Sequence, residues 1–449
     1  MAYTGKKLES KLYDVYTKSE TDLSIQTNST PTAVSDKTNT STGYFSLPSG
    51  TSAERPASPQ SGFSRYNTDT GSLEFYDGTN WIATNLIPTV NSVDGTIYSG
   101  AASSLTLNLT NATDVVDVKY YEGGVLLATD SDVTITSGAC TVNVPAAVYG
   151  QSSGDAISIT IFNQDGTPAS NSINKIVVAL PSGGTVTNSG GYTYHTFTSS
   201  TTFTNTIDNL SIEYAVVAGG GGGGCDRAGG GGAGGMSTGA VSLPTNNYPV
   251  VVGAGGARST SDTARGANGG NSSLHSIVSL GGGGGGSENI KEGASGGSGG
   301  GGSYAATFGG AGTSGQGNRG GFNTLNSPSR QTGGGGGKSQ AGTDGGKPDG
   351  GDGASWNGFG PFAGGGGGGE CDGDSGGTSG TVTRGDGGLG GGGRGGTSES
   401  NSNAYGVAGT SNTGGGGGGG GGVPSGTYVF DAAYGGAGGS GIVIIRYQL

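Results

Sequence analysis

The stretch YAVVAGGGGGGCDRAGGGGAGG, from Tyr214 to Gly235, passes from a run of apolar residues with β character directly into six consecutive glycines. Glycine loses more backbone freedom on folding than any other residue, and it brings no side chain to bury. The segment is therefore either a flexible linker or a place where nothing larger than hydrogen fits. This choice decides the fold, because the same pattern returns through the rest of the sequence.

The glycine runs from residue 219 onward share one arrangement, in which a nearly pure run alternates with a polar loop. They are Gly219–Gly224, Gly229–Gly232, Gly281–Gly286, Gly299–Gly302, Gly333–Gly337, Gly364–Gly369, Gly390–Gly393 and Gly414–Gly422. Gly/Ser composition is typical of linkers, but a linker gains nothing by excluding serine. A linker also does not need the β-like closing segment GSGIVIIRYQL (Gly439–Leu449), so we expect ordered runs and a final strand that pairs with an earlier one.

An ordered glycine run is compatible with a polyproline-II-like helix, which has three residues per turn and no internal hydrogen bonds. Its outward N–H and C=O groups must find partners on neighbouring segments. In a bundle that is crowded on every side, each position would require glycine. The pattern predicts a bundle of polyglycine-II helices over residues 219–449, with connecting loops at its ends.

The composition sets limits on the function. The 449 residues include 106 glycines, with 30% hydrophobic and 12% charged residues, which excludes a single large apolar core and argues against a self-repelling disordered chain. The net charge of -12 without a Lys/Arg cluster makes nucleic acid an unexpected partner. No apolar stretch approaches the roughly 18 residues of a membrane span, and no signal peptide is visible, so we expect synthesis in a cytoplasm.

The remainder of the chain predicts a mostly β protein with a short N-terminal helix. Residues 1–28 form an anchor or oligomerisation segment, or alternatively a frayed terminus, with one helical face made of Leu8, Leu12, Val15 and Tyr16. Residues 29–84 hold a polar linker and a small β module whose expected core is Phe63, Tyr66, Phe75, Tyr76 and Trp81.

Residues 85–181 alternate apolar and polar residues between Gly and Asp-Gly turns, which predicts about seven strands in a β-sandwich. Cys140 is expected on one of these strands as a small buried side chain. Residues 182–218 predict strands that lead into the glycine region, with His195 as a sheet residue rather than a metal ligand.

Several stretches resemble known families. AERPASPQSGFSRYNTDTGSLEFYDGTNWI (Ala53–Ile82) and VYTKSETD (Val15–Asp22) resemble segments of phage tail fibres and other virion appendages. Residues 85–181 are similar to immunoglobulin-like IPT/TIG modules, which act as spacers. EYAVVAGGGGGG (Glu213–Gly224), VVVGAGG (Val250–Gly256), GGNSSLHSIVSLGGGGGG (Gly269–Gly286) and GGSGIVIIRY (Gly438–Tyr447) resemble the glycine-rich tip adhesins of T-even-type phages.

These resemblances imply a virion fibre that is made in the host cytoplasm and attaches to tail, neck or capsid proteins through its N-terminus. They imply a homotrimer whose glycine-rich loops contact a bacterial surface glycan or outer-membrane protein. Because recognition hot spots favour aromatics, the contact candidates are loop rings. They are Tyr304, Phe308, Phe322, Trp356, Phe359, Phe362, Tyr405, Tyr428, Phe430 and Tyr434, and the alternative is that these rings pack loops together.

We do not expect an enzyme, a cofactor or a metal. The carboxylates Asp344, Asp349, Asp352, Asp372, Asp374 and Asp386 lie in glycine-rich turns, where aspartate serves turn geometry. Cys225 and Cys371 each follow a glycine run, so they form either a disulfide or two isolated thiols. The alternative functions are a structural capsid or neck fibre without a receptor, and a glycine-helix protein that binds ice or a mineral, which would need regular Thr/Ala arrays.

Overall fold

The computed structural model describes residues 47–449 except 70, 85–86, 113, 165, 305, 307, 324–330, 372–383, 399–401 and 423–432. Helix among these residues is limited to η1 (Ser52–Glu54), α3 (Ala146–Tyr149) and η2 (Ser402–Ala404), so the mostly β class is confirmed. None of the described helices has the length and apolar character needed to cross a membrane. The predicted helical face at Leu8, Leu12, Val15 and Tyr16 lies outside the described residues. The chain divides into two compact units, Met1–Leu86 and Ile87–Leu449.

The first unit is a four-stranded sheet in the order β1 (Ser49–Gly50), β2 (Ser64–Asn67), β3 (Ser72–Tyr76) and β4 (Trp81–Thr84). One face of this sheet carries charged side chains, because Arg65 and Glu74 stand opposite each other on β2 and β3. Both are buried, at 5% and 1% exposure, and Arg55 reaches the same carboxylate at 2.6 Å. The prediction of an aromatic core was therefore wrong for Phe63, Tyr66 and Phe75, which are exposed. Alternation along β2 and β3 turns Tyr66 and Phe75 away from the ion cluster, whereas Phe63 lies just before β2.

Tyr76 and Trp81, the other two expected core residues, are half-buried, with ring centroids 5.6 Å apart.

The second unit begins with two sheets that share one apolar core. The first sheet has the order β10 (Ala139–Asn143), β7 (Ser104–Thr110), β5 (Thr89–Asp94). The second has the order β6 (Ile97–Tyr98), β12 (Ile173–Val178), β11 (Ala156–Asn163), β8 (Val115–Glu122), β9 (Val125–Thr134). Alternate residues of β7, β8 and β11 point inward, and Cys140 is buried on β10 as predicted.

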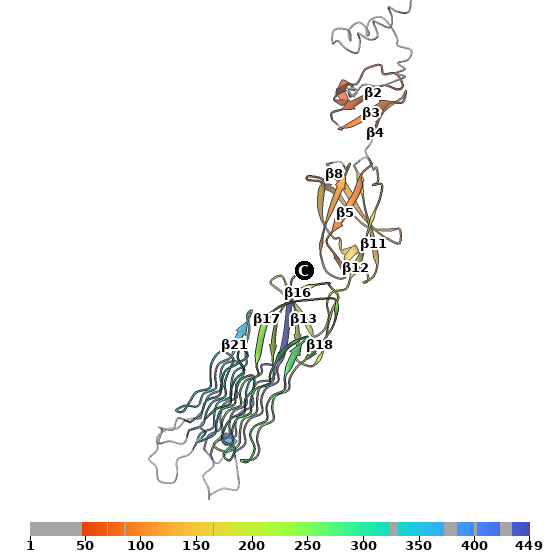
Figure 1. Cartoon of the computed structure of the whole chain (residues 1–449). Helices are drawn as coiled ribbons and strands as arrows, with labels where there is room; N and C mark the ends of the chain where they lie inside the picture. Colours follow the sequence, from red (N-terminus) through yellow and green to blue (C-terminus); the bar gives the residue numbers. More distant parts are fainter. Residues whose placement is uncertain are drawn as a thin grey trace, which may run out of the picture. The chain divides into compact units, whose positions relative to one another are not determined.

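Two further sheets lie at one end of the glycine region (Figure 1). One has the order β13 (Thr185–Ser189), β14 (Tyr192–Phe197), β23 (Ile442–Tyr447), β16 (Leu210–Val217), β17 (Met236–Leu243). The other has the order β15 (Thr201–Asn205), β18 (Asn246–Val251), β19 (Ser272–Leu274), β20 (Ile277–Ser279). The prediction that the closing strand pairs with an earlier one is confirmed, since β23 lies between β14 and β16.

His195 lies on β14 as predicted, and it is fully buried. Its Nδ1 is 2.7 Å from the Gly183 carbonyl oxygen, and its Nε2 is 3.1 Å from the Tyr447 hydroxyl on β23. The imidazole also stacks on the Tyr447 ring, with centroids 5.6 Å apart. The histidine therefore ties β14 to the closing strand.

The glycine runs are ordered segments held by hydrogen bonds to other runs. In the run Gly219–Gly224, residues three apart donate to the same neighbour. Gly219 and Gly222 donate to Gly270 and Ala267, Gly220 and Gly223 to Gly439 and Gly436, and Gly221 and Gly224 to Gly232 and Gly229. The acceptor number falls as the donor number rises, so these three neighbours run antiparallel to the run.

The carbonyl groups of the same run follow the same three-residue repeat. The carbonyls of Gly219 and Gly222 accept from Gly282 and Gly285, those of Gly220 and Gly223 from Gly256 and Ser259, and those of Gly221 and Gly224 from Gly417 and Gly420. Donor and acceptor numbers rise together, so these three neighbours run parallel to the run. The central run is thus surrounded by three antiparallel and three parallel segments, and its backbone polar groups are satisfied without a sheet.

Space is the reason for glycine in this run. A Cβ added at any position from Gly219 to Gly224 would lie less than 3.0 Å from a carbonyl oxygen of a neighbouring segment. None of these glycines has a φ in the left-handed region, so the requirement is steric rather than conformational. The runs form the core of this region, and the interpretation as linkers is wrong for the described runs.

Candidate recognition surface

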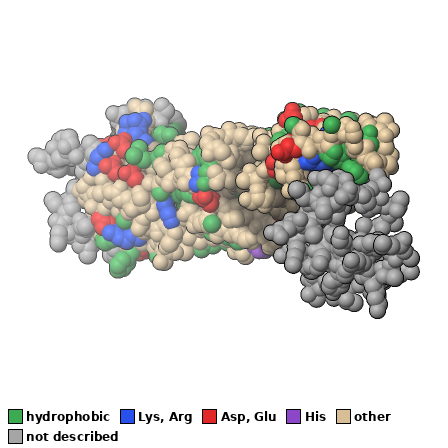
Figure 2. Space-filling model, turned by 90° about the horizontal axis from the view of Figure 1, so that it is seen from above, with side chains coloured by type: hydrophobic (Ala, Val, Ile, Leu, Met, Phe, Trp, Pro, Cys, Tyr) green, Lys and Arg blue, Asp and Glu red, His purple; other side chains and the backbone are tan. Residues whose placement is uncertain are grey.

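The glycine region has two ends, because successive segments alternate in direction. The sheet end meets β16, β17 and β23, and carries the hairpin β21 (Ala354–Trp356) and β22 (Phe359–Phe362). The loop end is the opposite end of the glycine segments (Figure 1). Figure 2 shows charged side chains gathered at this end, whereas the surface along the segments is mostly uncharged. The predicted aromatic residues that the structure describes are divided between these two ends.

The first cluster at the loop end surrounds Tyr304, which follows the run Gly299–Gly302. Its ring has the Arg227 guanidinium 5.7 Å and the Lys291 ammonium 5.0 Å from its centroid. Arg227 also forms a 2.7 Å ion pair with Glu288, and its carbonyl accepts the Tyr304 N–H. A tyrosine ring with two cations near its face presents an amphipathic surface of the kind found at recognition sites.

The second loop-end cluster contains Phe308 and Phe322, whose ring centroids are 6.2 Å apart. Arg319 lies 5.2 Å from the Phe322 ring and pairs with both oxygens of Asp344 at 2.7 Å. The hydrogen bond to Asp344 raises the pKa of Arg319, and a bidentate pair holds the guanidinium in a fixed plane. Phe308 is 68% exposed, so this cluster offers an apolar ring to solvent.

The third loop-end cluster pairs Tyr405 with Tyr434, at 5.5 Å between ring centroids. Arg258 lies 5.4 Å from the Tyr434 ring. Both tyrosines are half-buried. Tyr428 and Phe430 lie outside the described residues.

The WNGFGPF stretch (Trp356–Phe362) lies at the sheet end instead. Trp356 and Phe362 are buried, at 8% and 7% exposure, among Met236, Ile442 and Ile444. Phe359 packs on Tyr194 with ring centroids 5.1 Å apart. These rings fasten the hairpin to the sheet, which is the packing alternative for this group.

The structure adds partners that the aromatic pattern alone did not identify. Arg227, Arg258 and Lys291 each stand against a ring from another loop, and Arg319 stands against Phe322, three residues further along the chain. The sequence position of these cations could have indicated them, since each lies within a few residues of a glycine-rich segment.

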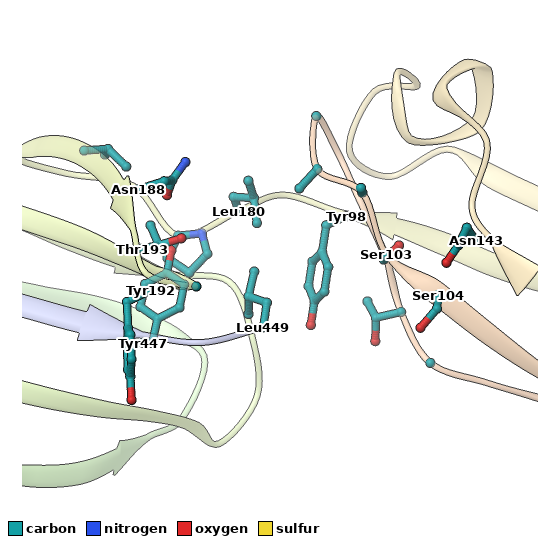
Figure 3. Close-up of a pocket in the computed structure, with 18 residues that line it drawn as sticks. Tyr98, Ser103, Ser104, Asn143, Leu180, Asn188, Tyr192, Thr193, Tyr447 and Leu449 are labelled. Carbon is teal, nitrogen blue, oxygen red and sulfur yellow. The ribbon is translucent and has the colours of Figure 1, made fainter. Parts of the chain in front are cut away.

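The cysteines and one pocket are the other features of this unit. Burial raises the pKa of the Cys225 thiol to about 12, and no disulfide joins it to the buried Cys371. Among the described residues no group of three His, Cys, Asp or Glu side chains is placed to hold a metal ion. The pocket in Figure 3 is lined by Tyr98, Ser103, Asn143, Tyr192 and Leu449 among others, and none of its described lining side chains is charged.

The fold and these loop-end clusters define a class of protein in which β-sheets support a bundle of glycine segments. The family model of the glycine-rich domain matches residues 196–448, more than half of the chain, so the chain belongs to this glycine-rich domain family. No curated protein and no solved structure matches the chain.

Proposed function

We propose that this chain is a bacteriophage tail fibre protein. It works as a homotrimeric virion appendage that attaches to the particle through residues 1–28 and recognises the host cell surface with its loop end. The partner is a bacterial surface glycan or an outer-membrane protein. The observation that carries the proposal is the set of aromatic and cationic clusters at the loop end. Glycine segments joined by main-chain hydrogen bonds support these clusters.

The proposal includes a finer description of the fold. The glycine segments are polyglycine-II helices, supported by hydrogen-bond partners that repeat every three residues. The two sheets from β5 to β12 form an immunoglobulin-like spacer, supported by their shared core. In this arrangement the sheets fix one end of the bundle and leave the other end to loops, where binding residues are commonly found.

Adsorption competition with the full chain tests the function. Purified protein should bind host cells and block attachment of the phage that carries it. Phe308→Ala should weaken this inhibition about tenfold or more, because exposed aromatic anchors carry a large share of binding energy. The matched control is Leu389→Ala, since Leu389 is also 68% exposed but lies at the sheet end, where its carbonyl accepts the Gly353 N–H.

A folded chain that binds no cells and leaves adsorption unchanged would contradict host recognition. The alternative, a structural fibre on the capsid or neck, would then account for the protein.

A further inference from the structure

The small β module of the first unit has its polar and apolar faces reversed relative to an ordinary sheet. On its covered face, Glu74 accepts hydrogen bonds from Arg55 at 2.6 Å and Asn67 at 3.0 Å, and lies 3.3 Å from Arg65. The turn that contains η1 closes this face, because Arg65 donates to the Thr51 carbonyl at 2.9 Å. The interior of the module is thus an ion cluster under a cover formed by its own chain.

The opposite face, which we name the apolar face, is open. It consists of Ser64 and four large side chains at positions that alternate with the ion cluster. Tyr66 stands opposite Leu73, and Phe75 opposite Ile82, so the four share one side of the sheet. Their exposed fractions are 43%, 43%, 39% and 39% in the order Tyr66, Leu73, Phe75, Ile82.

The apolar face is large for so small a module. Side chains of this size expose on the order of 200 Å² each, so four that are about two-fifths exposed offer roughly 300 Å². The largest contiguous apolar patch on a typical soluble monomer is about 300–600 Å² and is often functional. The apolar face reaches this range within one small module, which makes it a candidate contact surface.

The placement of the charges in the module is compatible with a second copy of the chain as the partner. Arg55, Arg65 and Glu74 belong to the covered face. The other described carboxylates accept backbone N–H groups at turns, Glu54 from Thr51, Asp69 from Ser52 and Asp77 from Thr79. No charge stands on the strand positions of the apolar face, so two such faces can meet without opposing like charges.

We propose that the apolar face is a self-association surface, covered by the same face of other copies of this chain. Roughly 300 Å² per copy is less than the ~800 Å² per partner of a standard interface, so this contact is one part of a larger assembly of copies. The inference deepens the homotrimer part of the proposed function and is independent of host recognition. A monomer that still blocks adsorption would overturn it and leave recognition standing.

Sedimentation of the full chain gives the first test. The wild type should be oligomeric, and a Leu73→Glu/Phe75→Glu double variant should self-associate at least tenfold more weakly. Val125→Glu is the matched control, because Val125 is 66% exposed on β9 in the other unit, and it should leave association unchanged. A monomeric wild type, or a double variant that associates like the wild type, would overturn the proposal.

A second variant does not depend on tolerance of charge on the sheet. Ser64 lies exposed on the apolar face, so Ser64→Cys should form crosslinks between chains with a short bismaleimide. Thr79→Cys, in the exposed turn before β4, should not. Absence of an interchain product from Ser64→Cys would count against the contact, and so would a monomer in which residues 1–46 of the same chain shield the face.

Discussion

Replacement of Gly221 by alanine should destabilise the glycine region severely. Its N–H donates to Gly232 at 2.8 Å, its carbonyl accepts from Gly417 at 2.9 Å, and an added Cβ would lie under 3.0 Å from the Gly283 and Gly282 oxygens. Overpacking a close-packed interior costs about 1–3 kcal/mol. Two weakened hydrogen bonds add about 1 kcal/mol each, for a total of about 3–5 kcal/mol.

Gly270→Ala is the matched control for this change. Gly270 belongs to a neighbouring segment but is exposed, and the nearest atom to an added Cβ is the Ala254 nitrogen at 3.1 Å. Alanine there should change stability by less than about 1 kcal/mol, because reduced freedom of the unfolded chain offsets a small adjustment.

The assay is urea unfolding of the full chain in a Trp81→Phe background, in which the remaining tryptophan is Trp356. This residue is buried against the sheet that supports the glycine segments and reports their unfolding. If Gly221→Ala and Gly270→Ala unfold within 0.5 kcal/mol of each other, roughly the error of such comparisons, the steric account of the runs is refuted.

Two further predictions concern the sheets. Deletion of residues 442–449 should expose the glycine region to proteolysis throughout, because β14 and β16 are joined only through β23 among the described strands; cleavage confined to loops would contradict this. Burial lowers the pKa of His195 below its ordinary value of 6.5, so the folded state favours the neutral imidazole. The stability that the neutral His195 contributes is complete above pH ~6.5 and is lost as the pH falls below that value toward the pKa of the folded state. The urea midpoint should therefore fall less between pH 7.5 and 5.5 in His195→Gln than in the wild type. Equal falls in both proteins would contradict it.

The sequence predicted the mostly β class, the pairing of the closing strand and the place of His195, because each depends on local periodicity. It did not predict which face of the small module is inside. Alternation separates Arg65 and Glu74 from Tyr66 and Phe75 but does not say which set is covered, and an ion cluster satisfied by Arg55 and Asn67 reversed the usual choice.

The division of the aromatic residues between two ends could have been derived but was not. Each glycine segment reverses direction, so consecutive loops lie at alternate ends of the region. Trp356 and Phe362 follow a segment that returns to the sheets, whereas Tyr304 and Phe322 follow segments that leave them. The identity of the six neighbours of Gly219–Gly224 could not be derived, since glycine carries no side chain to specify a partner.

The hydrogen bonds between glycine segments have a consequence for how such a protein diversifies. The bonds that hold the run Gly219–Gly224 among its six neighbours join main-chain atoms, so they do not depend on the residues in the loops between segments. Loop sequences can therefore vary from one lineage to the next without compensating changes in the scaffold. The length of a glycine segment is less free than the sequence of a loop. Because hydrogen-bond partners repeat every three residues, a segment keeps its set of neighbours only when its length changes by whole turns of three residues.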